Sequence, residues 1–361
     1  MFNFIFEKLF LSFITLIGVA TLVFFLFTVL PGDPAQMMLD QKSDSEQLKI
    51  LRTKFGFDQP ISDQYFYYMN DLSFISIHSL SKDHFTSYNK NKYGGFRLFK
   101  INDNIIVIKF PYLRTSYQKR GKKVLTIISE TLPNTLILAV TSISIAIFFG
   151  LFLGIISGYY KDHFIDKFFQ IFSMLGMSLP SFFTAILFSW FFGYVLFDYT
   201  NLNMTGSLYE LDDYGENYTI NIKNLILPSL VLGIRPIAVI VQLMRSQLIE
   251  ELSKEYIVTA KSKGLPMYRI IYFHAIKNSL NPIITAVSGW FASLLAGAVF
   301  VEYIFGWRGL GKEIVEALNT LDIPVIIGSV LVIATFFILI NTIVDIIYAY
   351  LDPQVKTNLN Q

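Results

Sequence analysis

The stretch that decides the fold is LPNTLILAVTSISIAIFFGLFLGIISGY, which runs from Leu132 to Tyr159 and contains no Asp, Glu, Lys or Arg. At a rise of about 1.5 Å per residue, about 20 helical residues cross the roughly 30 Å hydrocarbon core of a bilayer. In lipid, only a helix or a closed barrel satisfies every backbone hydrogen bond of such a segment. We therefore predict a membrane-spanning helix here.

The composition of the whole chain supports this prediction. Hydrophobic residues make up 53% of the 361 residues and charged residues only 16%, and the mean hydropathy is +0.50. A soluble domain has nearer to about 25% charged residues. The net charge of +2 argues neither for nor against an acidic partner. The chain has no Cys, which excludes disulfides, thiolate metal sites and Cys nucleophiles.

Five further apolar runs are long enough to span a bilayer, and none shows the alternation of barrel strands. They are Leu9–Leu30, Phe168–Phe197, Ile226–Met244, Ile283–Val301 and Pro324–Tyr348. The first run is too long for the apolar region of a signal peptide, so we predict a retained span. The expected fold class is an all-α integral membrane protein with about six transmembrane helices.

The charges of the short loops predict the orientation. The connection after the third span is acidic, whereas the connection after the fourth is basic. The acidic residues are Asp198, Glu210, Asp212, Asp213 and Glu216, and the basic ones are Arg245, Lys254, Lys261, Lys263, Arg269 and Lys277. The positive-inside rule places the basic connection in the cytoplasm. Both termini are then cytoplasmic, and the long loop 31–131 lies outside, since long loops translocate largely regardless of charge.

The long loop forms the main extramembrane mass. Within it, Phe96–Ile101 and Ile105–Ile108 flank Asn102-Asp103-Asn104, which predicts a hairpin. We expect a small extracytoplasmic α/β cap, with a separate binding domain as the alternative.

The expected organisation has four parts. They are a first span at 1–30, the cap region at 31–131, a core at 132–350 with a cytoplasmic loop at 251–281, and a cytoplasmic tail at 351–361.

The cytoplasmic loop carries the most informative local pattern. Glu255–Lys263 reads as a short helix with an acid in its first turn and lysines in its last, which complements the helix dipole. Gly264 follows where a left-handed cap is needed, and Pro266 stands where a second helix takes its N1 residue. Nucleic-acid readers share this helix–turn–helix outline. Because spans tether the element on both sides, we expect it to dock a cytoplasmic protein and no nucleic acid, rather than to be a plain solvated loop.

The same residues resemble a known motif. Glu255-Tyr256-Ile257, Thr259-Ala260-Lys261 and Lys263-Gly264 are similar to the EAA coupling motif of ABC importer permeases. In that family the motif helix sits in a groove of the ATPase subunit and transmits its closing motion to the spans. The resemblance implies that the ATPase-coupling residues are Glu255, Tyr256, Thr259, Ala260, Lys263 and Gly264. Thr259 departs from the pattern, because many members of the family have Ala there.

The resemblance covers nearly the whole chain and is specific to the dipeptide and oligopeptide branch, in which the chain is similar to the first of two membrane subunits. The residues that carry it are Leu30–Pro34, Gly56–Pro60, Gln64-Tyr65, Ser178–Ser181, Arg269–Ala275, Asn278–Pro282, Gly297-Ala298, Val301-Glu302, Gly306–Gly311 and Leu351–Pro353. The segment from Leu72 to Phe110 is the exception. It is longer than the usual linker and resembles no part of the family.

The resemblance implies a type I ABC importer transmembrane domain with cytoplasmic coupling helices, in a bacterial or archaeal cytoplasmic membrane. The implied partners are a second homologous permease subunit, two ATP-binding cassette ATPase subunits and an extracytoplasmic solute-binding protein. ATP and Mg²⁺ would be bound by the ATPase subunits, and we expect this chain to bind no cofactor or metal and to have no catalytic site. Gly306–Glu313 nearly spells a phosphate-binding loop, but Glu313 replaces the Ser or Thr that holds Mg²⁺.

Two features of the spans suggest packing and bending. Gly150, Gly154 and Gly158 recur every four residues, which leaves one helix face bare enough for close helix contact. Ser178 and Pro180 lie within the third span, where Pro breaks or kinks the helix near the expected translocation path.

Arg235 is the candidate polar residue of the fourth span. A cation at mid-bilayer costs about 3 kcal/mol even on insertion scales, so its side chain must face protein, water or a counter-charge. Two interpretations stay open, a pore-lining residue and an ion pair with another span.

The function implied by the resemblance is ATP-driven import of di- or oligopeptides, with this chain forming half of the translocation path. Nickel chelates and sugars remain alternative cargoes, since the binding protein sets specificity in this class. A stand-alone secondary transporter or channel is the main rival, although the spans hold few acids for ion coupling. A membrane-embedded enzyme lacks any supporting constellation of catalytic residues.

Overall fold

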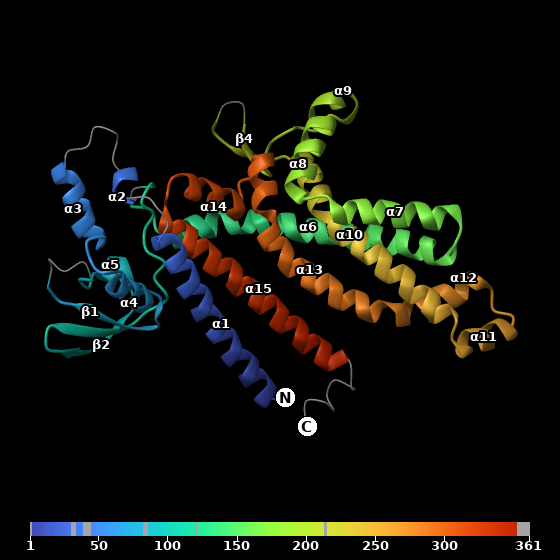
Figure 1. Cartoon of the computed structure of the whole chain (residues 1–361), viewed down its shortest axis with the longest axis horizontal. Coiled ribbons are helices and arrows are strands. Elements are labelled where there is room, and N and C mark those ends of the chain that lie inside the picture. Colours follow the sequence, from blue (N-terminus) through green and yellow to red (C-terminus); the bar gives the residue numbers. More distant parts are fainter. Residues whose placement is uncertain are drawn as a thin grey trace. The chain divides into compact units, whose positions relative to one another are not determined.

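The structure is a computed structural model, which describes residues 2–29, 34–38, 45–81, 86–119, 121–212 and 215–351 (Figure 1). The chain divides into two compact units. The first comprises Met1–Glu130 with Glu313–Thr335, and the second Thr131–Lys312 with Phe336–Gln361. Leu30–Asp33 of the first resemblance segment, Asp213 of the acidic connection and residues 352–361 of the expected tail lie outside the described residues.

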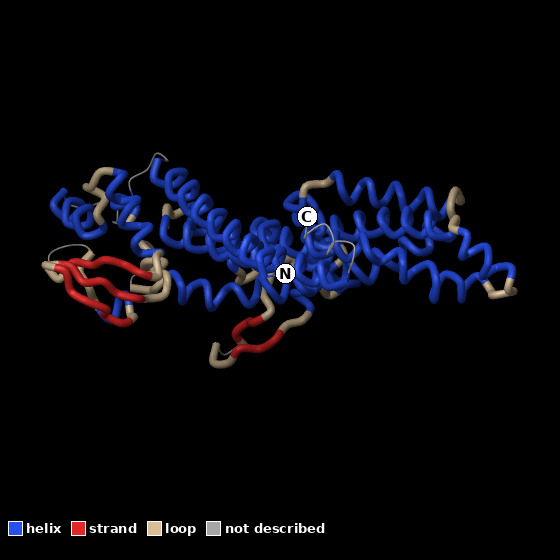
Figure 2. Tube along the Cα trace, turned by 90° about the horizontal axis from the view of Figure 1, so that it is seen from below, coloured by secondary structure: helices blue, strands red, loops and turns tan. Residues whose placement is uncertain are grey.

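Helices make up most of the described chain, and strands occur in two small sheets (Figure 2). The α-helices are α1 (Phe2–Val29), α2 (Pro34–Met37), α3 (Ser45–Phe55), α4 (Ile61–Leu72), α5 (Lys90–Tyr93), α6 (Val124–Tyr159), α7 (Phe164–Ser178), α8 (Ser181–Trp190), α9 (Phe197–Thr200), α10 (Lys223–Leu252), α11 (Glu255–Ser262), α12 (Met267–Ile270), α13 (Ile276–Phe305), α14 (Leu310–Asn319) and α15 (Ile323–Leu351). Two π-helical segments are η1 (Phe191–Val195) and η2 (Ile271–Ala275). The strands are β1 (Ile75–Ser79), β2 (Phe96–Ile101), β3 (Asn104–Ile108), β4 (Tyr209–Leu211) and β5 (Tyr218–Ile220).

The predicted number of spans agrees with the structure. Among the described residues, five helical segments are long and apolar enough to cross a membrane, and a bent helix pair raises the number to six. The five are Phe6–Thr28, Val124–Tyr159, Lys223–Leu252, Met267–Phe305 and Ile323–Val344. The all-α membrane fold with small sheets is thereby confirmed.

The third predicted span is the bent pair. Phe164–Ser178 and Ser181–Val195 meet at an angle of 107°. The cause is local, because the residue before a proline avoids the helical region. Leu179 accordingly has φ −81° and ψ 132°, and Pro180 becomes the N-cap residue of α8. The break that the sequence predicted at Pro180 is therefore present.

Several helices continue past the apolar runs that predict them. Helix α6 begins at Val124 rather than at Leu132, and α10 continues past Met244 to Leu252. The prediction that Arg245 belongs to the following connection is therefore wrong. Hydropathy detects only the part of a helix that suits lipid, whereas the backbone can stay helical beyond it.

The first unit combines α1, the start of α15 and the cap. Ala20, Val23 and Phe24 of α1 pack with Tyr68 of α4, and with Ile327 and Leu331 of α15, in one buried cluster. The cap contains an antiparallel sheet in the order β1-β3-β2. The predicted hairpin is confirmed as β2 and β3, with Asn102 at φ 52° in the left-handed region that Asn tolerates.

The second unit contains the broken span, α10, α11 and α13. It also contains a short antiparallel pair, β4 and β5, inside the acidic connection, which the sequence did not predict. Buried Asn224 donates to Glu210 Oε1 at 2.8 Å and to the Ser207 carbonyl at 3.0 Å. This contact attaches the base of the connection to the start of α10.

Candidate functional site

The predicted turn of the cytoplasmic loop is built as the sequence indicates. Helix α11 ends at Ser262, and Gly264 has φ +77°. The Gly264 N–H donates to the Lys261 carbonyl at 2.9 Å, and the Leu265 N–H donates to the Ala260 carbonyl at 3.3 Å. These two bonds form a Schellman motif, in which a left-handed residue closes the helix. The second helix begins one residue later than predicted, at Met267, with Pro266 as its N-cap residue.

Helix α11 presents an inner and an outer side. Ile257 is fully buried and Ala260 is 8% exposed, and their spacing of three residues places them on one helix face. The remaining candidate coupling residues, Glu255, Tyr256, Thr259, Lys263 and Gly264, are exposed. The helix is therefore anchored through its small and aliphatic residues, while its polar residues remain available to a partner.

A buried carboxylate that the sequence analysis missed connects α11 to two other helices. Glu251, near the end of α10, is 5% exposed. It accepts hydrogen bonds from the Tyr256 hydroxyl and from Lys254 Nζ. Asn278 of α13 donates to the Tyr256 oxygen at 3.1 Å. Glu251, Tyr256 and Asn278 thus link α10, α11 and α13 in one network.

The phenol in this network stays protonated. Although the Tyr256 side chain is partly exposed, partial removal of its hydroxyl from water, together with the hydrogen bond to the Glu251 carboxylate, raises the pKa of Tyr256 above its ordinary value. A protonated hydroxyl can donate to Glu251 while it accepts from Asn278. The network is therefore complete at neutral pH.

A second missed interaction joins α7 to α10. Asp166 is fully buried, and its carboxylate receives two hydrogen bonds from Arg245, at 2.6 and 2.8 Å. The Ser157 hydroxyl donates to the same carboxylate at 2.6 Å, and the Asp162 N–H donates at 2.9 Å. Two-bond Arg–carboxylate pairs are among the stronger charged interactions in proteins. This pair fixes the α6–α7 corner to the end of α10, close in sequence to Glu251.

The glycine stripe of α6 faces α10. A Cβ added at Gly150 would lie 2.7 Å from Ile240 Cβ, one at Gly154 would lie 2.6 Å from Met244 Cβ, and one at Gly158 would lie 3.1 Å from a Leu248 methyl carbon. The α10 residues that the three glycines meet are themselves spaced four apart, so one face of α6 packs along one face of α10. At these three positions the helices lie too close for a side chain on α6.

We predict that Gly154→Val lowers the stability of the chain in detergent. The new side chain would overlap Met244, and overpacking of this kind costs about 1–3 kcal/mol. The measurement is the midpoint of thermal unfolding of the purified chain. Gly18→Val in α1 is the matched control, because a Cβ there meets nothing within 4 Å. Equal midpoints for the two variants would contradict the close α6–α10 contact.

The structure does not bring the three candidate path residues together in one contact. Arg235 is exposed on α10, and within the described part of the chain no ion pair is found for it. Ser178 is exposed at the end of α7 and donates to the Met174 carbonyl at 2.8 Å. Pro180 is exposed at the start of α8. The alternative of an ion pair between Arg235 and another span finds no partner among the described residues.

The near-match to a phosphate loop has a structural role that the sequence analysis missed. This segment, Gly306–Glu313, follows helix α13 rather than a strand, and Gly306 closes that helix at φ +68°. Buried Glu302 accepts from the Gly311 N–H at 2.7 Å and so caps the first turn of α14. Trp307 Nε1 donates to the Asn134 carbonyl at 3.1 Å, which ties this turn to α6.

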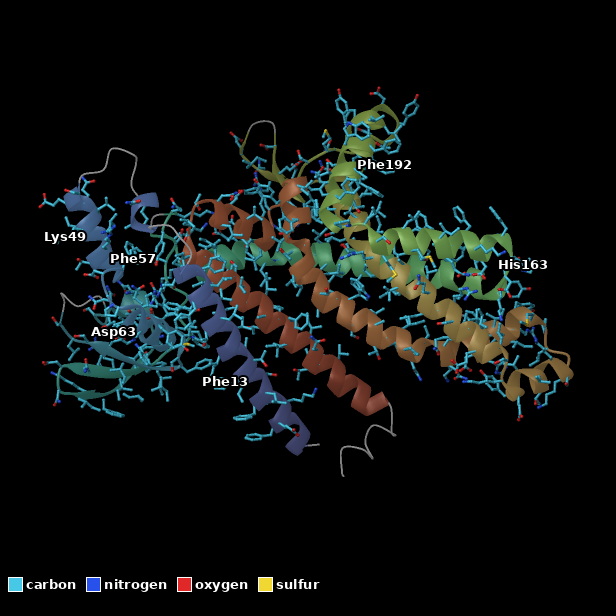
Figure 3. All side chains as sticks on the ribbon, viewed as in Figure 1. Phe13, Lys49, Phe57, Asp63, His163 and Phe192 are labelled. Atoms are coloured by element: carbon cyan, nitrogen blue, oxygen red, sulfur yellow. The ribbon has the colours of Figure 1, made fainter. Side chains whose placement is uncertain are left out.

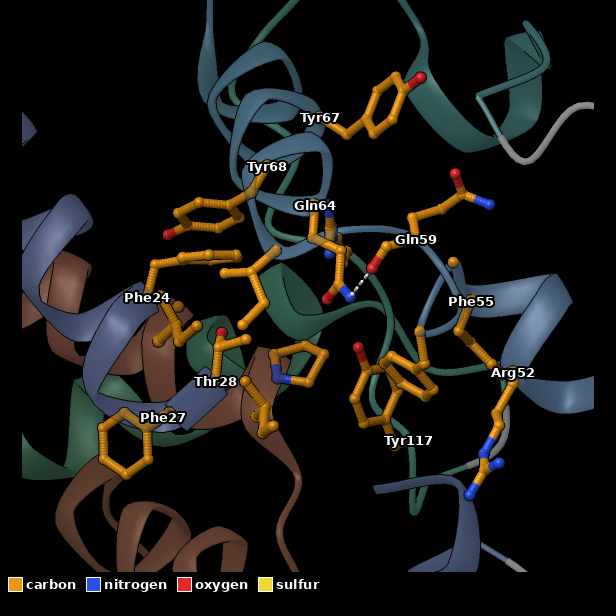
Figure 4. Close-up of a pocket in the computed structure, with 18 of the residues that line it drawn as sticks. Phe24, Phe27, Thr28, Arg52, Phe55, Gln59, Gln64, Tyr67, Tyr68 and Tyr117 are labelled. Atoms are coloured by element: carbon orange, nitrogen blue, oxygen red, sulfur yellow. Dashed lines mark hydrogen bonds between the residues drawn. The ribbon is translucent and has the colours of Figure 1, made fainter. Parts of the chain in front are cut away.

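A pocket of about 560 Å³ lies within the first unit (Figure 4). Its lining includes Phe24 of α1, Gln64 and Tyr68 of α4, and Phe57 and Gln59 of the resemblance segment at 56–60. Gln64 donates to the Gln59 carbonyl at 2.8 Å. None of the candidate site residues from the sequence lines this pocket.

Comparison with known proteins agrees with this arrangement. Residues 150–357 match the family model described as binding-protein-dependent transport system inner membrane component, and residues 1–139 match the model of its N-terminal part. The chain is 32% identical to the dipeptide transport system permease protein DppB of Alkalihalophilus pseudofirmus, over 97% of this chain and 98% of that protein. It is 30% identical to the protein of the same name from Lactococcus lactis, over 99% and 100%. It is also 30% identical to the glutathione transport system permease protein GsiC of Salmonella typhi, over 99% of each.

The two family models together match most of the sequence, on both sides of the long extramembrane loop as well as within it. The coupling motif, the broken span and the three glycines of the stripe all fall within the larger match. The chain belongs to the family of inner membrane components of binding-protein-dependent transport systems, as an ABC importer permease.

Proposed function

We propose that the chain forms half of the translocation path for di- or oligopeptides in an ATP-driven importer. The observation that carries this proposal is α11, a capped helix with a buried anchor side and an exposed polar side, placed at the residues that resemble the coupling motif. The named dipeptide and glutathione permeases among its relatives support peptides over nickel chelates or sugars.

The proposed assembly contains four kinds of partner besides the lipid bilayer. A second homologous permease subunit completes the path, two ATPase subunits bind ATP and Mg²⁺, and a solute-binding protein delivers the peptide. Both termini and α11 lie on the cytoplasmic side, as the charge of the connections predicts. Arg235 lines the path, since its exposed cation lacks a counter-charge among the described residues.

The mechanism follows from how α11 is attached. When the ATPase subunits close on ATP, they displace the exposed side of α11. The hydrogen bonds from Tyr256 to Glu251 and from Asn278 to Tyr256 then carry the displacement to α10 and α13 together. Rigid-body movement of packed helices is a common way to switch between two states. The path thereby alternates between outward-open and inward-open forms.

The assembly is tested by affinity purification of the chain from its own host in mild detergent, followed by mass spectrometry. We expect a second permease and ATPase subunits to co-purify, and to be lost when Glu255 and Gly264 are altered. Repeated recovery of the chain alone, or as a homo-oligomer, would favour the secondary-transporter alternative.

We predict that Glu251→Gln weakens coupling without removing the fold. Hydrogen bonds to a charged acceptor stabilise by about 1.5–3 kcal/mol, and those between neutral groups by about 0.5–1.5 kcal/mol. The loss of about 1 kcal/mol corresponds to roughly a fivefold change in an equilibrium constant. We therefore expect the amount of peptide transported per ATP hydrolysed to fall several-fold.

The control for this variant is the neighbouring residue. Glu250→Gln removes a carboxylate whose side chain is 62% exposed and which lies 3.9 Å from Lys254. Its transport per ATP should equal that of the parent chain. A drop of the same size in both variants would show that surface charge, and not the Glu251 network, controls coupling.

A further inference from the structure

Strand β1 has the reverse of the usual polarity. Ser76 and His78 are 0% and 1% exposed, whereas Ile75 and Ile77 are 61% and 55% exposed. A half-buried strand in water normally turns its apolar residues inward. The polarity of this strand therefore indicates that its outward side does not face water in the assembled protein.

The register extends the exposed apolar row across all three strands. Ile75 pairs with Ile108, and Ile108 with Phe96; Ile77 pairs with Ile106, and Ile106 with Phe99. Phe110 extends the row beyond the end of β3. We call these seven residues the apolar face: Ile75, Ile77, Phe96, Phe99, Ile106, Ile108 and Phe110. Phe96 and Phe110 are 82% and 84% exposed.

The opposite face of the sheet is already packed. The His78 ring lies 4.0 Å from the Tyr93 ring, and the Ser76 hydroxyl is hydrogen-bonded to His78 Nε2 at 2.9 Å. The cations of β2, Arg97 and Lys100, pair with Val107 and Ile105, which belong to this packed face. The core of the cap is thus complete without the apolar face, and the apolar face itself carries no charged residue.

The apolar face continues into the outward surface of α1 through α4. Phe25 of α1 is 41% exposed, and its ring stacks on Tyr65 of α4 with a centroid distance of 5.3 Å. The Tyr65 ring contacts Phe66, which is 68% exposed. One turn after Phe66, on the same face of α4, the Asn70 amide both donates to and accepts from the Ile77 backbone, each at 2.9 Å.

Helix α1 is itself a membrane-spanning segment with its apolar side chains exposed, Leu22 at 65% and Leu26 at 54% among them. In a membrane, those side chains contact lipid. The surface that reaches from them through Phe25, Tyr65 and Phe66 to the sheet is therefore continuous with a lipid-facing surface.

We propose that the apolar face binds the surface of the lipid bilayer, in the leaflet at the Val29 end of α1. Strand β2 is a sheet edge, since the strand order is β1-β3-β2, and the open backbone groups of a sheet edge are not tolerated in the hydrocarbon core. The sheet must then lie flat at the boundary of headgroups and acyl chains, with one face inserted. Aromatic side chains favour this depth. The expectation that the segment 72–110 resembles no part of the family is wrong, since the model of the family's N-terminal part matches residues 1–139 across it. The present proposal gives that segment a role.

The test uses the absence of Cys from the natural sequence. Single variants Phe96→Cys and Phe110→Cys carry a nitroxide label, in the complete importer reconstituted into vesicles of phosphatidylethanolamine and phosphatidylglycerol. Collision of the label with oxygen, which concentrates in lipid, is compared with collision with a water-soluble nickel complex. Phe13→Cys on α1, 58% exposed, is the lipid control, and Lys49→Cys on α3 is the water control (Figure 3).

We expect both labels to resemble Phe13→Cys, with more frequent oxygen collisions and fewer nickel collisions than Lys49→Cys. Frequent nickel collisions, as at Lys49, would show that the face lies in water and would overturn the proposal. Protection from both reagents would also overturn it, since the face would then be covered by a protein such as the second permease, the binding protein or another copy. Both labelled positions are highly exposed, so neither substitution removes a core residue.

Discussion

Arg245→Ala is expected to lower the free energy of unfolding by about 3–5 kcal/mol, which is the range for breaking a buried ion pair by removing one partner. The Asp166 carboxylate is fully buried and would lose both of its hydrogen bonds from Arg245. The remaining donors, the Ser157 hydroxyl, the Asp162 N–H and the Gln170 amide, do not neutralise its charge. The measurement is the stability of the purified chain against a denaturing detergent, compared with the parent.

The double variant Asp166→Asn with Arg245→Met provides the control. It removes both charges, so no buried charge is left without a partner, and much of the lost stability should return. A double variant as unstable as the sum of the two single variants would contradict a specific Asp166–Arg245 interaction.

Gly264→Val is expected to abolish coupled transport while the chain is still made and inserted. Gly264 has φ +77°, a conformation that a β-branched residue resists. A Cβ at this position meets no atom within 4 Å, so the effect comes from the backbone and not from a clash. Loss of the Schellman turn would change the angle at which α11 leaves the spans. The measurement is ATP-driven peptide uptake at matched expression.

Gly264→Asn is the matched variant, because Asn tolerates the left-handed region. It should retain a substantial part of the uptake. Equal loss in both variants would show that glycine is needed there for a reason other than its backbone conformation, and normal uptake by Gly264→Val would remove the turn from the coupling mechanism.

Local signals explain what the sequence predicted well. The apolar runs predicted the spans because lipid imposes a minimum length on each. Gly264 and Pro180 act on their own backbone and immediate neighbours, so the capped turn and the broken span were both predictable. The hairpin around Asn102 was predictable for the same reason.

Long-range contacts explain what the sequence analysis missed. Asp166 and Arg245 are far apart in the chain, and nothing in the local pattern pairs them. Glu251 looked like one more charge at a helix end, although it is buried under Tyr256. One signal was present in the sequence, since an acid inside an apolar helix such as α7 requires a partner. The alternation of polar and apolar residues in β1 was also visible in the sequence, but alternation alone does not indicate which face of the strand is buried.

The most direct test of the central claim is uptake of a labelled dipeptide by vesicles that contain the co-purified importer, with its binding protein outside and ATP either inside or absent. We predict accumulation that requires internal ATP and is lost when this chain carries Gly264→Val. Accumulation without ATP, driven by a proton or sodium gradient across vesicles that contain this chain alone, would contradict the account.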